Sequence, residues 1–257
     1  MRTALVAAWL SLFVGGIGPG PVFGEPAAGT QQQETTGEIA IVVDDFGYFM
    51  NETVHGFLAL DIPVTISVIP SLRYSSRIAD AAWASDKEVM AHIPMEPIDY
   101  PAKNPGGSAL FVKYDDAELR GRIVAALDSY PRFVGVNNHM GSRAMQDPRL
   151  LGILMKEIEG RGLFFVDSKT IPGERPRTIA RDHGVRFGEN RLFWDTGFST
   201  PDEIRTNLDR LAQIARRGGR AIAIGHPRAV SLAILKEKLP ELKKLGIRFV
   251  KVSEIVH

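Results

Sequence analysis

Two adjacent carboxylates, Asp44 and Asp45, directly follow the apolar run 39–43. Five apolar residues in a row, most of them β-branched, predict a strand that is buried on both faces. In α/β folds, the loops after the carboxyl ends of parallel strands carry the chemistry. Because neighbouring side chains point in different directions, one carboxylate could bind a metal while the other stays free as a base. A helix cap beside a solvated partner is the alternative explanation for this pair alone.

The pattern of an apolar strand that ends in Asp, Glu or His recurs along the chain. The later polar ends are His92 with Glu96 four residues on, Asn137-Asn138-His139, Asp167, Asp195 and His226. Capping alone does not readily explain six such ends, although Asp195 by itself is equally consistent with a cap or turn. Metal ligands and acid or base groups converge at the carboxyl rim of a barrel, so the pattern favours a catalytic rim.

The residue types at these ends suit a divalent metal, and zinc is the metal we expect. Asp45, His92 and His139 could supply one oxygen and two nitrogens, with one position left open for water. Glu96 is predicted as a fourth ligand or as a group that supports the ligands. Each histidine considered alone could equally be a core residue.

The remaining polar residues suit proton transfer and substrate binding. Asp44 could take a proton from the attacking water, and His226 could protonate the leaving group. Asp167 could orient a histidine ring nitrogen or hold substrate. We assign substrate contacts to Asn138 and Arg143, although Arg143 could instead pair with a carboxylate.

Strands and helices must alternate to bring these residues together. Helix-start signals such as Asp147-Pro148 and Thr200-Pro201 separate the apolar runs. Short strands are expected near 185–187 and 192–194, and a last strand at 248–252. Seven or eight β/α units in succession predict an α/β fold with a parallel sheet closed, or nearly closed, into a barrel. A flat doubly wound sheet is the alternative, but the polar strand ends are spread along the whole chain rather than gathered at one switch point.

Length and charge place the chain among single-domain globular proteins. It has 257 residues, with 31 basic and 30 acidic side chains and a formal net charge of +1. This balance provides no strong field for nucleic acid or acidic lipid. The Arg-rich stretch 216–220 is interpreted as a solvated helix end, where cations suit the helix dipole. Because the chain contains no cysteine, disulfides and thiolate metal ligands are excluded.

The first residues read as a targeting segment. Arg2 precedes an apolar run over 4–14 and then several Gly and Pro residues, which is typical of a secretory signal peptide. We predict a signal peptide over 1–24, a flexible spacer over 25–37 and a folded domain over 38–257. Export across the inner membrane to the periplasm follows, with no membrane span after cleavage. An uncleaved anchor is the alternative.

Five segments carry a resemblance to a known family. They are Ile41-Val42-Val43-Asp44-Asp45-Phe46-Gly47, His92-Ile93-Pro94-Met95-Glu96-Pro97, Asn137-Asn138-His139-Met140-Gly141-Ser142, Val166-Asp167-Ser168 and Gly225-His226-Pro227. Together they resemble the divergent polysaccharide deacetylase family, a distant relative of the carbohydrate esterases that remove N-acetyl groups from chitin-like and peptidoglycan sugars. The resemblance covers about residues 38–256. It implies a distorted seven-stranded β/α barrel, with Asp44 as base, Asp45 as metal ligand and His226 as acid.

The chain departs from the ordinary deacetylases at two motifs. Their two histidines four residues apart read here as His92 and Glu96, so the second histidine ligand must come from elsewhere, and we assign it to His139. Their Arg-Pro-Pro-Tyr-like motif is replaced by Asn137-Asn138-His139.

These observations predict a metal-dependent hydrolase that deacetylates an N-acetylated cell-envelope polysaccharide. A non-catalytic envelope module that binds glycan or a partner protein is the alternative. A phosphoesterase is a weaker one, because Arg143 and Lys169 are the only evident basic groups on the rim for a phosphate.

Overall fold

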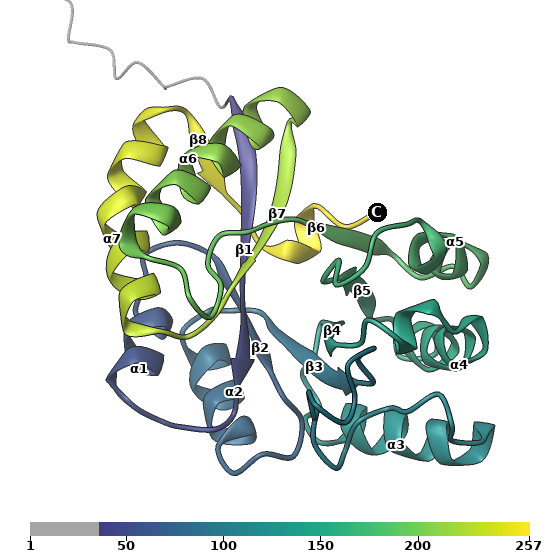
Figure 1. Cartoon of the computed structure of the whole chain (residues 1–257). Helices are drawn as coiled ribbons and strands as arrows, with labels where there is room; N and C mark the ends of the chain where they lie inside the picture. Colours follow the sequence, from purple (N-terminus) through teal and green to yellow (C-terminus); the bar gives the residue numbers. More distant parts are fainter. Residues whose placement is uncertain (1–35) are drawn as a thin grey trace, which may run out of the picture. The chain divides into compact units, whose positions relative to one another are not determined.

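The structure is a computed structural model and describes residues 36–257 (Figure 1). The predicted signal peptide and almost all of the predicted spacer lie outside the described residues. No helix within 36–257 is long and apolar enough to cross a membrane. The elements are β1 (Gly37–Phe46), α1 (Glu52–Leu58), β2 (Val64–Val68), α2 (Ser75–Ala84), β3 (Val89–Met95), α3 (Asp116–Asp128), β4 (Gly135–Met140), α4 (Pro148–Glu159), β5 (Phe164–Asp167), α5 (Arg175–Asp182), β6 (Phe187–Phe193), α6 (Pro201–Gly218), β7 (Arg220–Gly225), α7 (Ala229–Lys244) and β8 (Ile247–Phe249), with short 3-10 helices at Ala144–Gln146 and Val252–Glu254.

Strand β1 closes the sheet into a barrel. It pairs in parallel with β7 through residues 38–43 and with β2 through residues 41–46, while β2 to β7 pair in sequence order. The short strand β8 pairs with residues 37–39 of β1, which precede the part of β1 that pairs with β2. The predicted seven-stranded distorted barrel is therefore confirmed, and the flat doubly wound alternative is wrong.

The alternation of side chains along each strand divides the apolar core into two parts. The inner part fills the barrel and consists of Ala40, Val42, Met90, Phe164, Val166, Ile222 and Ile224, with Val250, Val252, Ile255 and Val256 added near the first residues of β1. The larger, outer part lies between the strands and the surrounding helices. Apolar side chains therefore fill the barrel interior directly beneath the polar residues at the carboxyl ends of the strands.

The helix-start signals act as predicted. The Asp147 side chain accepts from the N–H groups of Arg149 and Leu150, and Thr200 and Glu203 form a reciprocal capping box at the start of α6. These caps fix where α4 and α6 begin after their rim loops.

Two short strands expected near 185–187 and 192–194 are instead the single strand β6, and the last strand is β8 rather than 248–252. The polar residues 188–191 interrupt the apolar pattern of β6, which is why the sequence suggests a break. The Asn190 side chain bridges an irregularity there, because its Oδ1 accepts from the N–H groups of Leu192 and Ile224.

Candidate metal and catalytic site

The polar residues of the site continue the inner face of the strands. Asp44 follows two residues after Val42, and His92 two residues after Met90, and both apolar residues fill the barrel interior. Asn137 has the same inward phase on β4. Asp44, His92 and Asn137 are at most 2% exposed. A polar layer therefore lies directly above the apolar layer of the barrel.

Asp45 reaches the same centre through an irregular backbone. Regular alternation would turn it away from Asp44, but its φ of +60° is left-handed, and the pairing of β1 with β2 shifts register between Val43 and Phe46. Aspartate tolerates this conformation better than most residues. Two neighbouring carboxylates can thus serve one site.

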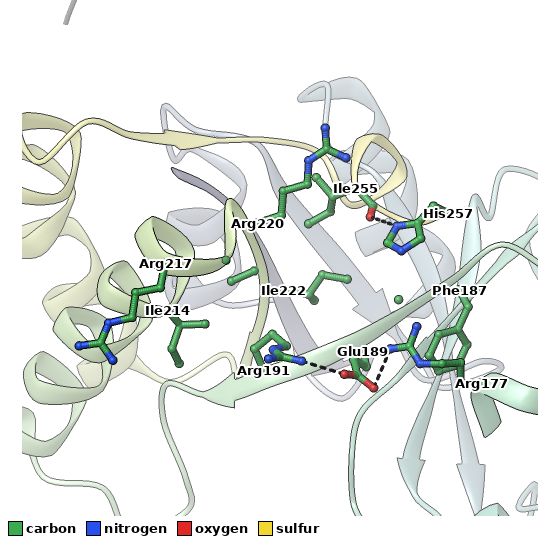
Figure 2. Close-up of a pocket in the computed structure, with 13 residues that line it drawn as sticks. Arg177, Phe187, Glu189, Arg191, Ile214, Arg217, Arg220, Ile222, Ile255 and His257 are labelled. Carbon is green, nitrogen blue, oxygen red and sulfur yellow. Dashed lines mark hydrogen bonds and ion pairs between the residues drawn. The ribbon is translucent and has the colours of Figure 1, made fainter. Parts of the chain in front are cut away.

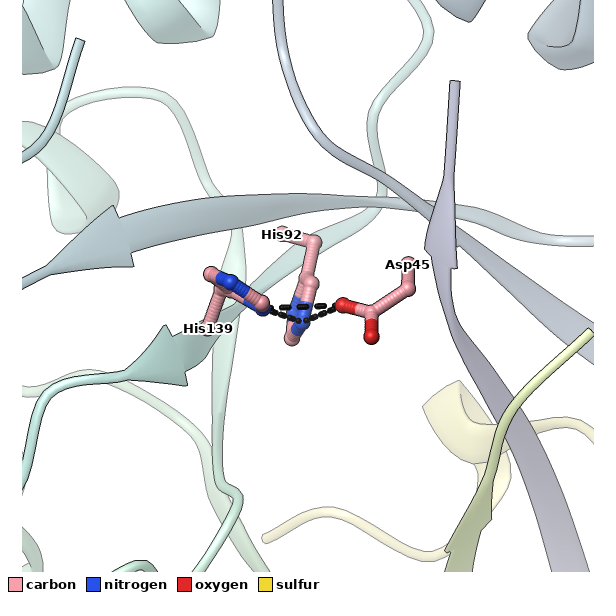
Figure 3. Close-up of side chains that lie close together, drawn as sticks. All are labelled: Asp45, His92 and His139. Atoms are coloured by element: carbon pink, nitrogen blue, oxygen red, sulfur yellow. Dashed lines mark hydrogen bonds and ion pairs between the residues drawn. The ribbon is translucent and has the colours of Figure 1, made fainter. Parts of the chain in front are cut away.

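Asp45, His92 and His139 converge on a common point (Figure 3). Oδ1 of Asp45 lies 2.8 Å from Nδ1 of His139 and 3.2 Å from Nε2 of His92, and the two ring nitrogens are 3.2 Å apart. Ligand atoms about 2.0–2.2 Å from a tetrahedral zinc lie about 3.3 Å from one another.

The burial of Asp45 supports the same fit. Its Oδ1 is buried, and no donor within 36–257 is aligned with it. An oxygen without an aligned donor, facing two imidazole nitrogens, matches the donor set that a divalent metal takes. Among the described residues, no other group of three or more Asp, Glu or His side chains converges in this way.

Asn137 links Asp44 to His92. Its Nδ2 donates to Oδ1 of Asp44 at 2.8 Å, while its Oδ1 accepts from Oγ of Ser67 at 2.6 Å and lies 2.8 Å from Nδ1 of His92. Because a carboxylate only accepts, the amide must turn its NH₂ group to Asp44 and its oxygen to His92. Nδ1 of His92 therefore carries a proton, which leaves Nε2 as the nitrogen that could bind a metal.

Burial and neighbouring charges have opposite effects on the pKa values of Asp44, Asp45 and His92. Burial raises the pKa of the Asp44 carboxyl above its usual value, against the opposing charge of His92. Burial alone would raise the pKa of Asp45 as well, but His139 and His92 outweigh it and hold that pKa well below its usual range. Burial would lower the pKa of His92, yet the carboxylates of Asp44 and Asp45 raise it to about 8.

His226 approaches the centre from β7 with its own buried partner. Its Nδ1–H donates to Oδ1 of Asp195 at 2.7 Å, and Oδ2 of Asp195 accepts from the His226 backbone N–H at 3.1 Å and from the Ser231 hydroxyl. Nε2 of His226 lies 3.9 Å from Oδ2 of Asp45. Burial would lower the pKa of His226, but Asp195 outweighs it, so the pKa is raised.

Asn137 and Asp195 are the residues that the sequence analysis left without a role. Asn137 shares the phase of His139, two residues on, so alternation along β4 could have selected it over Asn138. Asp195 follows the apolar run 192–194, but nothing in the local sequence separates a site residue from a cap or turn there. Its contact with His226 follows from the pairing of β6 with β7.

The structure does not bring Glu96 to the group of Asp45, His92 and His139. Its Oε2 accepts from the Val112 N–H at 2.7 Å, and its Oε1 lies 3.5 Å from Nε of Arg143. The chain near Leu110 pairs with the end of β3, which brings the Val112 N–H to the Glu96 carboxylate. Arg143 thus pairs with a carboxylate, the alternative left open above, and its side chain is 60% exposed.

Asn138 faces away from the centre. Its Nδ2 donates to the Met140 carbonyl at 2.8 Å, and its Oδ1 accepts from the Ser168 N–H at 2.9 Å. Both ends of a 1% exposed amide are therefore hydrogen-bonded, and its oxygen joins β4 to the loop after β5. Asn138 thus helps to hold this loop, and the substrate contact expected of it stays a prediction.

Asp167 lies on the outer face of the barrel. It follows Val166, which fills the interior, so alternation turns it outward, and its Oδ1 accepts from the Lys169 N–H at 2.7 Å. Burial raises the pKa of Asp167 to about 6. Within the described residues it contacts no histidine of the site, so the expected catalytic role has no geometric support.

We expect Asn137→Ala to weaken zinc binding by about 10- to 100-fold, because His92 would lose the partner that fixes its tautomer. The neighbouring variant Asn138→Ala is the matched control and should stay within about threefold of the wild type. Competition with a chromophoric chelator measures both affinities. Equal weakening in the two variants would contradict the role of Asn137.

We expect Asp167→Asn to raise the free energy of unfolding at pH 8 by about 1–3 kcal/mol. The folded-state pKa of about 6 lies above the ordinary aspartate value of 3.8, so the folded state binds the proton more tightly. That stabilisation is complete below about pH 4 and is lost as the pH rises through 6, where the buried carboxylate must ionise. Asparagine keeps the oxygen that accepts from Lys169. Urea unfolding at pH 4.5 and pH 8 checks this, and a variant less stable than the wild type at pH 8 would refute it.

Comparison with known proteins identifies a family for this chain. A model of the divergent polysaccharide deacetylase family matches residues 41–256. A Haemophilus influenzae protein described as uncharacterized is 33% identical over 205 residues, which cover 80% of this chain and 72% of that protein.

Two solved structures share the fold. ATU2773 from Agrobacterium tumefaciens C58, described as uncharacterized, matches with a TM-score of 0.80 and 28% identity over 86% of this chain and 89% of that chain. BA3943 from Bacillus anthracis, described as a CE4 family pseudoenzyme, matches with a TM-score of 0.52 and 14% identity over 86% of this chain and 65% of that chain. From the extent of the family match, this chain belongs to the divergent polysaccharide deacetylase family.

Proposed function

We propose that this protein is a zinc-dependent hydrolase that removes acetyl groups from an N-acetylated polysaccharide of the cell envelope. The observation that carries the proposal is the convergence of Asp45, His92 and His139, with Asp44 and His226 beside them. Membership of the family supports an acetylated carbohydrate as the kind of target.

The proposed ligands leave the other residues free for proton transfer. A divalent metal held by Asp45, His92 and His139 would polarise the amide carbonyl and make water more acidic. Asn137 holds Oδ1 of Asp44, so Oδ2, which lies 3.6 Å from Nε2 of His92, can take a proton from water. The raised pKa of Asp44 makes it a stronger base than an ordinary carboxylate.

His226 is the proposed acid. Asp195 binds its Nδ1–H, so Nε2 faces the site and can give a proton to the leaving amine. The raised pKa of His226 keeps the ring protonated to higher pH than that of an ordinary histidine. Base and acid thus come from two paired strands, from β1 and from the end of β7.

We further propose that the protein works in the periplasm. This rests on the sequence of residues 1–24, which has the pattern of a secretory signal, and on the envelope glycan proposed as substrate.

The experiment is acetate release from tetra-N-acetylchitotetraose by the zinc-loaded protein. We expect release that stops when zinc is chelated, returns when zinc is added back and is lost in Asp45→Ala. No acetate from this or from N-acetylated peptidoglycan fragments would contradict the proposal.

One observation favours a second candidate, a non-catalytic envelope module that binds glycan or a partner protein. Glu96 stands where ordinary deacetylases have their second histidine, and its carboxylate is turned to Val112 and Arg143. Glycan binding that persists without metal, together with no turnover, would favour this candidate.

A further inference from the structure

A separate pocket of about 510 Å³ lies around the first residues of β6 and β7 (Figure 2). Its wall includes Arg220, the first residue of β7, whereas His226 of the proposed catalytic site follows the last residue of that strand. The pocket also borders α5 and α6. It lies where the first residues of β6 are not paired with β7, since the two strands pair from Asn190 and Ile222 onward.

The pocket has an excess of positive charge. Four arginines and one glutamate line it, namely Arg177, Arg191, Arg217, Arg220 and Glu189. Two of these arginines belong to the stretch 216–220, which the sequence suggested was only a solvated helix end. An arginine fork matches the planar oxygens of carboxylate and phosphate groups.

The single carboxylate in the pocket is shared among several cations. Lys169 and Arg177 lie 3.1 and 3.0 Å from Oε2 of Glu189, and Arg191 lies 2.9 Å from Oε1. Across the pocket, Arg220 shares Glu38 with Arg248. Glu174 also pairs with Arg177 and Lys169, and Glu254 lies 3.9 Å from Arg248. Six cationic side chains in and around the pocket thus face four glutamates, and an anion would be attracted.

The pocket also offers an acceptor and an apolar floor. Oε2 of Glu189 is already engaged by Lys169 and Arg177, but Oε1 contacts only Arg191 among the described residues and can accept a further hydrogen bond. Ile222 and Ile255 lie between Arg220 on one side and Glu189 with Arg191 on the other (Figure 2). A ligand that fits would combine an oxyanion, hydroxyl donors and a carbon-rich face.

We propose that this pocket binds an anionic monosaccharide, such as a sugar phosphate or a uronate. Its charged group would contact Arg191 and Arg220, a hydroxyl would donate to Glu189, and the ring would lie on Ile222 and Ile255. The volume is within the range of small-molecule sites, roughly 300–1,000 Å³. The site does not depend on the proposed deacetylation.

The test is calorimetric titration of the full protein with glucose 6-phosphate, glucuronate, glucose and inorganic phosphate. We expect at least one charged sugar to bind saturably and at least tenfold more tightly than both glucose and inorganic phosphate. The two charged sugars separate a phosphate site from a carboxylate site. Arg191→Gln combined with Arg220→Gln should weaken that binding at least tenfold.

The matched control is Arg210→Gln combined with Arg216→Gln, which removes the same charge from α6 outside the pocket lining. It should change affinity less than twofold. Asp45→Ala should also keep the affinity. No saturable binding of either charged sugar up to 10 mM, equal weakening in both double variants, or loss of binding in Asp45→Ala would overturn the proposal.

Discussion

Replacing Asp44 with asparagine is expected to lower the rate of acetate release by about a thousandfold while zinc stays bound. An amide cannot take a proton from water, so the proposed base is lost. The new side chain still has an oxygen that can accept from Nδ2 of Asn137, so the tautomer of His92 should be preserved. Single-turnover rates at saturating substrate, with zinc content measured on the same samples, test the prediction.

Asp167→Asn is the matched control for this variant. It makes the same chemical change in a buried aspartate at the end of another strand, β5, but on the outer face of the barrel. We expect it to keep the wild-type rate. An Asp44→Asn variant that retains more than a tenth of the wild-type rate would exclude Asp44 as the base.

Replacing Asp195 with asparagine is expected to lower the rate by about a hundredfold and to narrow the pH range of activity. His226 must be protonated to act as an acid, so activity falls as the pH rises through its pKa. Asp195 raises that pKa, and its removal should therefore move the alkaline limb of the pH profile to lower pH. Rates from pH 5 to pH 10 measure this shift.

Ser231→Ala should have a smaller effect, because it removes one of three donors to Asp195 and leaves the charge in place. An alkaline limb that stays at the same pH in Asp195→Asn would show that Asp195 does not set the protonation of His226.

Most of the barrel could be predicted from the sequence, since apolar runs and helix caps mark nearly every element. The exception is β6, where Glu189 and Arg191 face outward and Asn190 bridges an irregularity with its side chain. Polar residues of this kind remove the apolar signal of a strand, so two fragments were expected in place of one.

The site could be predicted in part, because residue type indicates chemistry but not direction. Asp167 ends an apolar run as Asp44 does, yet its side chain faces outward, whereas that of Asp44 faces the barrel interior. The choice between Asn137 and Asn138 depends on the same alternation. Glu96 has a carboxylate that could bind a metal, but this carboxylate accepts a hydrogen bond from Val112, a loop residue 16 positions further on.

Asp45 and Asp195 show what alternation cannot predict. Asp45 reaches His92 and His139 through a left-handed backbone and a shift in strand register. Asp195 contacts His226 because β6, which ends just before Asp195, pairs with β7, which ends just before His226. Both depend on backbone geometry that the residue types do not encode.

The most direct test of the account is the zinc content of the purified protein, compared among the wild type, His92→Ala and Glu96→Ala. Elemental analysis after equilibration with zinc should find about one equivalent in the wild type and in Glu96→Ala, and almost none in His92→Ala. A wild type that stays metal-free when zinc is supplied, or a His92→Ala variant that keeps a full equivalent, would contradict the metal centre of Asp45, His92 and His139.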